Sequence, residues 1–153
     1  MRISDYLSPT FVVAHMEARD VDGIVHELSA RAAGVGVGSA SLIAERLLER
    51  ERAHPTVVGA GLAIPHATVP GLEDPVIGIG RSDDPIDFGP PDLGPVRVFF
   101  VLLSPTGQER LHVKLLARIC RLGRHHDFIG ELVAAESEEG IIEVVGAMDR
   151  LHV

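Results

Sequence analysis

Apolar side chains recur at three- and four-residue spacing in five segments of the chain, a pattern that predicts amphipathic helices. The first segment follows Asp20 and the second follows Ser39, and both residue types commonly cap helix N-termini. Glycines at positions 34, 36 and 38 separate the two segments. We therefore expect one helix after Asp20 and a second that runs from Ser39 to about Arg52.

The second half of the chain carries the other three helical patterns. Thr106 and Glu109 match a capping box, which closes the first turn of a helix, and this helix is expected to reach about Gly123. A shorter helix is expected over Asp127–Ala135, and the last one starts near Ser137. All five helices therefore follow from local patterns.

Short runs rich in β-branched residues lie between the helices and predict the strands of a sheet. They cover Phe11–His15, a pair of short strands or an irregular edge in Val57–Ile64, Val76–Gly80 and Val96–Leu103. The run from Val96 is nearly all apolar, so it should be a central strand covered on both faces. Pro65 lacks a backbone N–H and is expected to stop any ladder, and Asp83–Pro85 is expected to turn.

Strands embedded among helices imply a three-layer α/β/α architecture, with helices on both faces of a mixed β-sheet. The length of 153 residues falls in the usual range for one domain, ~100–200 residues. The sequence shows no linker, internal repeat or low-complexity tract. We expect residues 1–153 to form a single α/β domain.

The composition narrows the classes of function. The net charge of −8 comes from acidic residues spread along the chain, and this argues against a nucleic-acid partner because a phosphate backbone would be repelled. Cys120 is the only cysteine, so the chain has no internal disulfide and fits a reducing compartment. No apolar run has the length of a signal peptide or a membrane span. We predict a cytoplasmic protein with no direct membrane insertion.

Neither a metal nor a nucleotide cofactor is expected. The chain has eight histidines, but it has no His-x-x-x-His pair, and the adjacent His125 and His126 cannot share one helix face. The glycines of Gly34–Gly38 lack the lysine of a phosphate-binding loop. Ser82 and Ser104 have no Gly-x-Ser-x-Gly context, so a hydrolase triad has little support.

His66 is the strongest candidate for chemistry because of the residues that precede it. Pro65 fixes its own backbone and biases Ile64 toward an extended conformation, so the imidazole is presented from a stiff mount. Small residues at 59–61, 63 and 67 leave room for a macromolecule to approach. A histidine is mostly neutral near pH 7, and its free ring nitrogen can attack phosphorus. The alternative is a histidine that ends a strand and hydrogen-bonds a carbonyl.

The segment Gly-Leu-Ala-Ile-Pro-His-Ala, at residues 61–67, resembles the phosphorylation-site motif of a known family. This family comprises the enzyme IIA proteins of the bacterial phosphoenolpyruvate-dependent sugar phosphotransferase system, in the fructose, mannitol and nitrogen-regulatory branch. The resemblance covers nearly the whole chain. It includes Leu-Leu-Glu-Arg-Glu at 47–51, Pro-Ile-Asp-Phe-Gly at 85–89, Leu-Leu-Ser-Pro at 102–105 and His-Val-Lys-Leu-Leu-Ala-Arg-Ile at 112–119.

The resemblance implies roles for three catalytic residues. His66 corresponds to the phospho-acceptor, which becomes a tele-phosphohistidine, and Arg50 and His112 correspond to the other active-site residues. A guanidinium suits a dianionic phosphoryl group, and His112 could donate a hydrogen bond to it. Without the motif, Arg50 would be interpreted as a solvated arginine at a helix end and His112 as a core histidine bonded to a carbonyl. Ala60 and the segment His54–Val58 depart from the family pattern.

The same resemblance implies two protein partners and no cofactor. The donor would be the histidine-containing phosphocarrier protein, and the acceptor a IIB domain or protein on a separate chain, in sugar uptake or nitrogen-type regulation. One alternative is a regulatory binding module, whose His66 phosphorylation state controls a partner transporter or kinase without onward transfer. A second alternative is a structural relative that no longer accepts phosphate.

Overall fold

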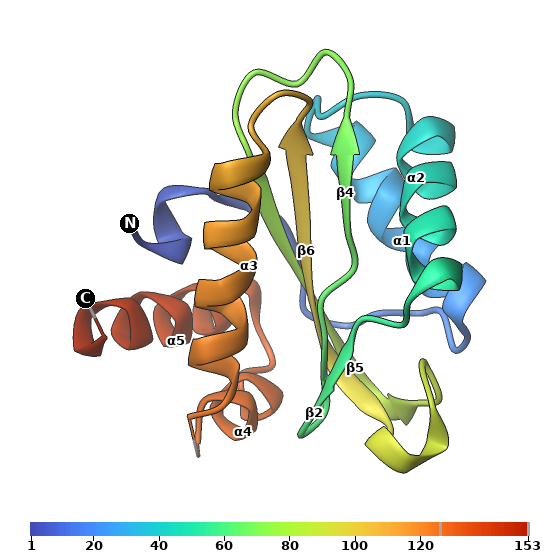
Figure 1. Ribbon diagram of the computed structural model, residues 1–153. Coiled ribbons are helices and arrows are strands. Elements are labelled where there is room, and N and C mark those ends of the chain that lie inside the picture. Colours follow the sequence, from blue (N-terminus) through green and yellow to red (C-terminus); the bar gives the residue numbers. More distant parts are fainter. Residues whose placement is uncertain (126, 153) are drawn as a thin grey trace.

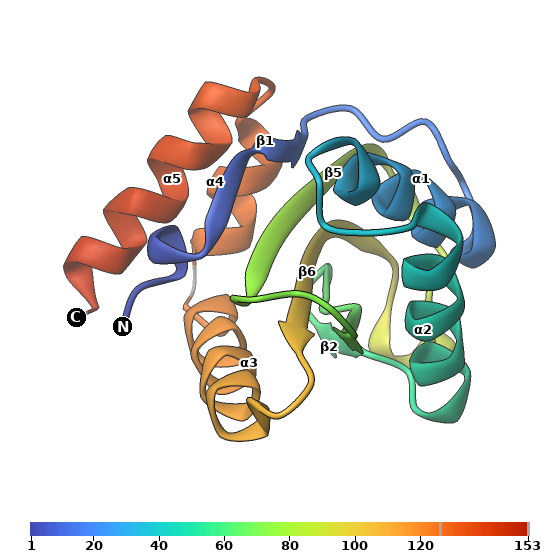
Figure 2. The ribbon, with the colours of Figure 1, turned by 90° about the horizontal axis from the view of Figure 1, so that it is seen from above.

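The computed structural model describes residues 1–125 and 127–152, so His126 and Val153 lie outside the described residues. The described α-helices are α1 (Val21–Gly34), α2 (Ala40–Ala53), α3 (Glu109–Gly123), α4 (Phe128–Ala134) and α5 (Glu138–Leu151), and two 3₁₀ turns are η1 (Ile3–Asp5) and η2 (Pro91–Leu93). A central sheet separates the helices into two layers (Figure 1). Seen from above, α1 and α2 lie on one side of the sheet, and α3, α4 and α5 lie on the other (Figure 2).

The sheet is mixed, and its strand order is β1-β5-β6-β3-β2, with β4 also paired to β6. The strands are β1 (Leu7–Val13), β2 (Val57–Gly59), β3 (Leu62–Ala63), β4 (His66–Val69), β5 (Val76–Ile86) and β6 (Val96–Pro105). β6 runs antiparallel to β5 and parallel to β3 and β4. The predicted central position of this strand is confirmed, since every residue of β6 except Arg97 is buried.

Apolar side chains form one core on each face of the sheet. Successive residues of a strand point to opposite faces. Phe99 and Val101 of β6 therefore join the core beneath α1 and α2, whereas Phe100 and Leu102 join the core beneath α3, α4 and α5. This arrangement confirms the predicted three-layer α/β/α architecture.

Two helix starts, after Asp20 and Ser39, follow the predicted capping pattern, and the helix expected to start near Ser137 is capped in the same way. The side chains of Asp20, Ser39 and Ser137 each accept a hydrogen bond from the backbone N–H three residues further on. These bonds satisfy donors that the first turn of a helix leaves without a partner. In the part of the chain that the structure describes, no helix is both long and apolar enough to cross a membrane.

The capping box predicted at Thr106 is wrong. The helix α3 begins at Glu109, and its N-terminal flanking residue makes no side-chain capping bond. Gly107 has a φ of +88°, which only glycine adopts without strain, and it turns the chain before the helix begins. The carboxylate of Glu109 accepts the Gly107 N–H at 3.1 Å instead.

Two strands extend beyond their predicted limits. β1 begins at Leu7 rather than at Phe11. β5 continues through the predicted turn at Asp83–Pro85, because the pairing with β6 shifts register between Arg81 and Ile86 and so accommodates the extra residues. The turn signals of the sequence therefore mark an irregular stretch of strand.

A buried ion pair anchors the N-terminal segment to α5. Arg118 and Asp149 lie 2.9 Å apart and are 2% and 0% exposed. Asp149 also accepts hydrogen bonds from the backbone N–H groups of Ile3 and Ser4 and from the Ser4 hydroxyl. Burial opposes the charge of Asp149, but these bonds outweigh burial and lower the pKa of its carboxyl below the ordinary value.

Candidate active site

His66 is the first residue of β4 and stands on a strand that pairs with β6 alone among the described strands. Pro65 interrupts the ladder as predicted, since β3 ends at Ala63, but the pairing with β6 resumes at His66 in the same register. Proline lacks only the donor, and the carbonyl of Pro65 still accepts the Leu102 N–H at 3.0 Å. His66 then pairs with Leu102 in the parallel register. The sheet therefore holds the backbone of His66.

A single hydrogen bond fixes which nitrogen of His66 carries the proton. Nδ1 lies 2.7 Å from the carbonyl oxygen of Ile64. A carbonyl can only accept, so Nδ1 donates and Nε2 carries the lone pair of the neutral ring. Burial lowers the pKa of His66, the Ile64 hydrogen bond opposes this effect, and the charge of Arg50 lowers the pKa further. The ring is thus neutral near pH 7, and Nε2 can act as a nucleophile.

His112, in the first turn of α3, faces His66 with 5.4 Å between the ring centroids. Its Nδ1 lies 2.7 Å from Oγ of Ser104, a fully buried residue of β6. Burial lowers the pKa of His112, the charges of His66 and Arg50 act in the same direction, and Glu109 opposes them. The partner of His112 is therefore a hydroxyl rather than the carbonyl of the alternative interpretation.

Two arginines approach the same point from α2, which lies on the other side of β4 from α3 (Figure 1). Arg46 and Arg50 are one helical turn apart and share a face of the helix. Arg50 is half-buried, and its Nη1 donates to the carbonyl of His54 at 3.3 Å. Within residues 1–125 and 127–152, neither guanidinium forms an ion pair with a carboxylate. Both positive charges are thus available to an anion.

The three residues predicted from the sequence, Arg50, His66 and His112, line one pocket of about 470 Å³. The other lining residues are Arg46, Glu49, Ala53, Ala67, Thr68 and Leu116. The pocket thus combines two guanidinium groups with two imidazoles in a chain whose net charge is −8. This set can bind a phosphoryl dianion through charge-assisted hydrogen bonds beside a nucleophilic nitrogen.

Residues 5–147 match the sequence model of the family described as phosphoenolpyruvate-dependent sugar phosphotransferase system, EIIA 2. The chain belongs to this family. A nitrogen regulatory protein of Bradyrhizobium diazoefficiens is 37% identical to this EIIA chain over 146 residues, which make up 95% of each protein. The fructose-specific EIIABC component of Bacillus subtilis is 27% identical over 98% of this chain, a stretch that covers 24% of that longer protein.

Solved structures of IIA proteins share the fold of this EIIA chain. The crystal structure of nitrogen regulatory protein IIA-Ntr from Neisseria meningitidis superposes with a TM-score of 0.86 at 24% identity, over 94% of this chain and 98% of that one. Enzyme IIAMTL of Escherichia coli, solved in complex with phosphorylated enzyme IIBMTL, gives a TM-score of 0.77 at 14% identity, over 92% and 96% of the two chains.

Two residues of this EIIA site were missed from the sequence. Arg46 had an available signal, since its spacing of four residues from Arg50 places both on one face of a helix. Ser104 lies in the Leu-Leu-Ser-Pro block of the resemblance, but its contact with His112 depends on how α3 packs against β6, which the sequence does not show. In the register of β4 and β6, Ser104 lies opposite Thr68, which also lines the pocket.

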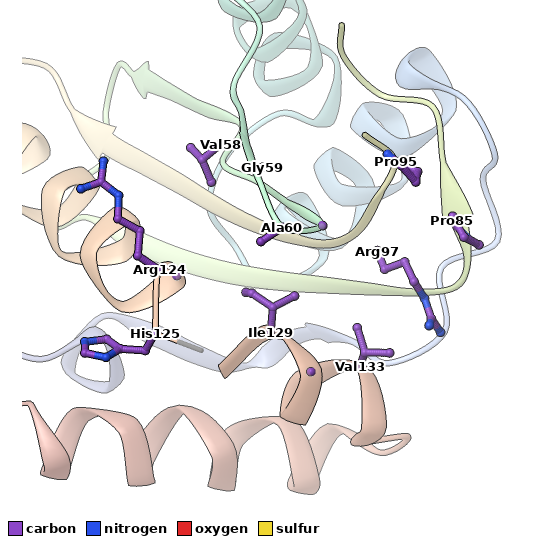
Figure 3. Close-up of a pocket in the computed structure, with 13 residues that line it drawn as sticks. Val58, Gly59, Ala60, Pro85, Pro95, Arg97, Arg124, His125, Ile129 and Val133 are labelled. Atoms are coloured by element: carbon purple, nitrogen blue, oxygen red, sulfur yellow. The ribbon is translucent and has the colours of Figure 1, made fainter. Parts of the chain in front are cut away.

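A larger groove of about 780 Å³ lies elsewhere on this EIIA chain and shares no lining residue with the His66 pocket. Figure 3 shows Ile129 of α4 beneath the turn that carries Ala60. The small residues Gly59–Gly61 line this groove, so the expectation that they surround His66 is wrong. The extended residues 62–65, at about 3.3 Å per residue, carry the chain away from the turn before it reaches His66.

Cys120 lies half-buried in α3, and burial raises the pKa of its thiol. A cysteine with a raised pKa carries little thiolate and reacts slowly. Throughout residues 1–125 and 127–152, no group of three or more His, Cys, Asp or Glu side chains is arranged to hold a metal ion.

Proposed function

We propose that residues 1–153 act as one EIIA phosphocarrier domain in the cytoplasm. In this role the chain accepts a phosphoryl group on His66 Nε2 from the histidine-containing phosphocarrier protein and passes it to a IIB component on a separate chain. The observation that carries the proposal is the hydrogen bond of 2.7 Å from His66 Nδ1 to the Ile64 carbonyl. This bond leaves Nε2 with its lone pair free for attack.

The transfer exchanges one nitrogen–phosphorus bond for another. The bond between phosphorus and the donor's imidazole nitrogen breaks as the bond to His66 Nε2 forms, and the bonding electron pair returns to the donor ring. Because Nδ1 keeps its proton, the phosphorylated ring gains positive charge, which the carbonyl of Ile64 stabilises. Onward transfer reverses these changes, and the electron pair returns to Nε2. Such a reaction depends on in-line positioning and on neutralising the phosphoryl oxygens.

Arg50 and His112 supply that neutralisation in the proposed reaction. The guanidinium of Arg50 contacts the phosphoryl oxygens, and it forms no ion pair in the described part of the chain, although Glu49 lines the same pocket. When Ser104 donates to Nδ1 of His112, the other ring nitrogen carries a proton and donates to a phosphoryl oxygen. Neither role requires a cofactor.

The test is a phosphorylation assay with purified components. The chain is incubated with phosphoenolpyruvate, enzyme I and the phosphocarrier protein, and its intact mass is measured before and after acid treatment. We expect an acid-labile increase of one phosphoryl group in the wild type and none in His66→Ala. A wild type that gains no mass from a donor active on another IIA protein would refute the proposal. An adduct that persists in His66→Ala would show that a residue other than His66 is phosphorylated.

A regulatory role is the second candidate function. It is favoured by the 37% identity to a nitrogen regulatory protein that matches this chain over 95% of both lengths. In this case the phosphorylation state of His66 controls a partner transporter or kinase, and no onward transfer occurs. Candidate IIB proteins are mixed with the phosphorylated chain to separate the two roles. Rapid loss of the phosphoryl group to a IIB protein supports carriage, whereas a stable phosphorylated form with altered binding to another protein supports regulation.

A further inference from the structure

Glu51 is a buried acid next to Arg50 at the end of α2, and it plays no part in the mechanism described above. Its side chain is 6% exposed, and Asp149 is the one other buried acid among residues 1–125 and 127–152. Asp149 has an arginine partner, whereas no described arginine, lysine or histidine forms an ion pair with Glu51. A buried carboxylate without a counter-ion is costly unless hydrogen bonds satisfy it, so its partners are informative.

Both partners of Glu51 belong to Thr56. The backbone N–H of Thr56 donates to Oε2 and its hydroxyl donates to Oε1, each at 2.6 Å. Thr56 is 7% exposed and lies directly before β2. Burial raises the pKa of the Glu51 carboxyl, and the two Thr56 hydrogen bonds oppose that rise. The carboxylate thus clamps the end of α2 to the start of the β2–β3 hairpin.

The same clamp leads to His66 through two further hydrogen bonds. The carbonyl of Thr56 accepts the N–H of Ile64 at 3.1 Å, across the hairpin. The carbonyl of Ile64 accepts Nδ1–H of His66 at 2.7 Å. Ile64 is 2% exposed. The one residue between Ile64 and His66 is Pro65, whose ring fixes its backbone φ. Three hydrogen-bonded steps therefore connect Glu51 to the imidazole.

We infer that Glu51 and Thr56 are positioning residues for His66. They hold the carbonyl of Ile64 at the place where it accepts the Nδ1 proton, and they thereby keep Nε2 unprotonated. A free neutral imidazole populates both tautomers, and the hydrogen bond made by one nitrogen decides the state of the other. This inference rests on the proposed function, since an unprotonated Nε2 matters only if that atom accepts the phosphoryl group.

The neighbouring residues Arg50 and Glu51 then divide two tasks at one site. Successive helical residues point in directions about 100° apart, so one side chain lines the pocket while the next faces the interior. Arg50 faces the pocket, where its positive charge can contact the phosphoryl group. Glu51 faces the protein interior and sets the protonation of His66 through the hydrogen-bonded chain. A purely structural clamp would predict loss of stability in Glu51 variants without any change in the His66 tautomer.

The decisive experiment measures the His66 tautomer in the unphosphorylated protein. Long-range ¹H–¹⁵N spectra of imidazole-labelled protein distinguish a protonated from an unprotonated ring nitrogen, and His66→Gln identifies the signals. We expect Nδ1–H with unprotonated Nε2 in the wild type, and a mixture of tautomers in Glu51→Ala. Glu51→Gln retains an acceptor and a donor for Thr56 and should restore the wild-type tautomer. Because no phosphoryl transfer is involved, this result stands even if the proposed function fails.

A second variant and a matched control keep the test independent of stability. Thr56→Val removes the hydroxyl with little change in volume, and it serves as the test if Glu51→Ala does not fold. Thr56→Val should shift the tautomer, whereas Thr56→Ser, which keeps the hydroxyl, should not. Val25 is buried in α1, in the core that also contains Val57. Val25→Ala should therefore destabilise the fold without removing any of the hydrogen bonds between Glu51 and His66. The inference is overturned if both Glu51→Ala and Thr56→Val keep the wild-type tautomer, or if Val25→Ala shifts it equally.

Phosphoryl uptake supplies the second readout. If the wild type is phosphorylated, Glu51→Ala should lower the initial rate by up to about 100-fold, as expected when a reacting atom is misplaced by about 1 Å. Glu51→Gln should recover most of the rate. A rate in folded Glu51→Ala equal to that of Val25→Ala would contradict the positioning role, whatever the stability of the two variants.

Discussion

The rings of His66 and His112 face each other with 5.4 Å between their centroids, and burial lowers the pKa of both. Two neutral imidazoles can lie this close without electrostatic repulsion. Each ring has one nitrogen already engaged, with the carbonyl of Ile64 or the hydroxyl of Ser104. The pair is therefore oriented before any phosphoryl group arrives.

Replacing Arg50 with alanine should slow phosphoryl uptake by about 100-fold, since loss of one donor to a developing anion costs ~10²–10³ in rate. Stability should change little, because the hydrogen bond from Arg50 to His54 is long, at 3.3 Å. Initial rates from intact mass and thermal midpoints check both statements. Arg52→Ala is the control, since Arg52 is exposed and lies outside the pocket. Equal slowing in Arg52→Ala, or a large fall in the thermal midpoint of Arg50→Ala, would contradict the prediction.

Replacing Ser104 with alanine should slow uptake by about tenfold, because an unsatisfied buried partner costs ~1–3 kcal/mol and His112 loses its fixed orientation. The measurement is the initial rate with saturating donor. Ser29→Ala is a matched control, since Ser29 is also buried and its hydroxyl has no hydrogen-bond partner in the described residues. If Ser104→Ala and Ser29→Ala take up phosphoryl groups at the same rate, the hydroxyl of Ser104 does not contribute to the reaction.

Acidification should destabilise the fold through His66. Its pKa in the folded state lies below the ordinary value of 6.5 that it regains on unfolding. The unfolded chain therefore binds more protons below pH 6.5, and the free energy of unfolding falls as the pH drops through the folded pKa. Urea unfolding of the wild type and His66→Gln across this range measures His66 together with its charge effect on His112. His15, whose pKa is raised by Asp83, acts oppositely in both proteins. Parallel pH profiles would refute this prediction.

Removing the carboxylate of Asp149 should cost about 3–5 kcal/mol in the free energy of unfolding, because Arg118 would remain as a buried charge without a counter-ion. The backbone donors of Ile3 and Ser4 would also lose their acceptor. Urea unfolding of Asp149→Ala tests this, with Glu143→Ala as an exposed acid on the same helix. The folded fraction of Asp149→Ala should take up phosphoryl groups at the wild-type rate. A loss of stability no larger than in Glu143→Ala would show that the pair contributes little.

The sequence was sufficient where the structure depends on neighbouring residues. Asp20, Ser39 and Ser137 cap helices through bonds to residues three positions away, and the apolar run from Val96 made a central strand evident. Thr106 failed as a cap because the backbone of Gly107 turns the chain away, a conformation that side-chain type alone does not encode.

The candidate site was predictable in part because its motif lies in short blocks of sequence. His66, Arg50 and His112 came from the resemblance, and the structure brings them to one pocket. The contact of Ser104 with His112 depends on how α3 packs against β6, and that of Glu51 with Thr56 depends on the path of the chain between α2 and β2. Such contacts arise from tertiary packing, which leaves no periodic signal along the chain.

His66 is the first residue of β4, and β4 lies between α2 of one layer and α3 of the other (Figure 1). In the proposed carrier role, Arg50 reaches the phosphoryl group from the layer of α1 and α2, and His112 reaches it from the layer of α3, α4 and α5. In this role the phosphoryl group on His66 contacts both helix layers within a single pocket. A donor and an acceptor that both need this pocket cannot bind at the same time, so in each proposed cycle the phosphorylated chain must leave its donor before it binds its acceptor.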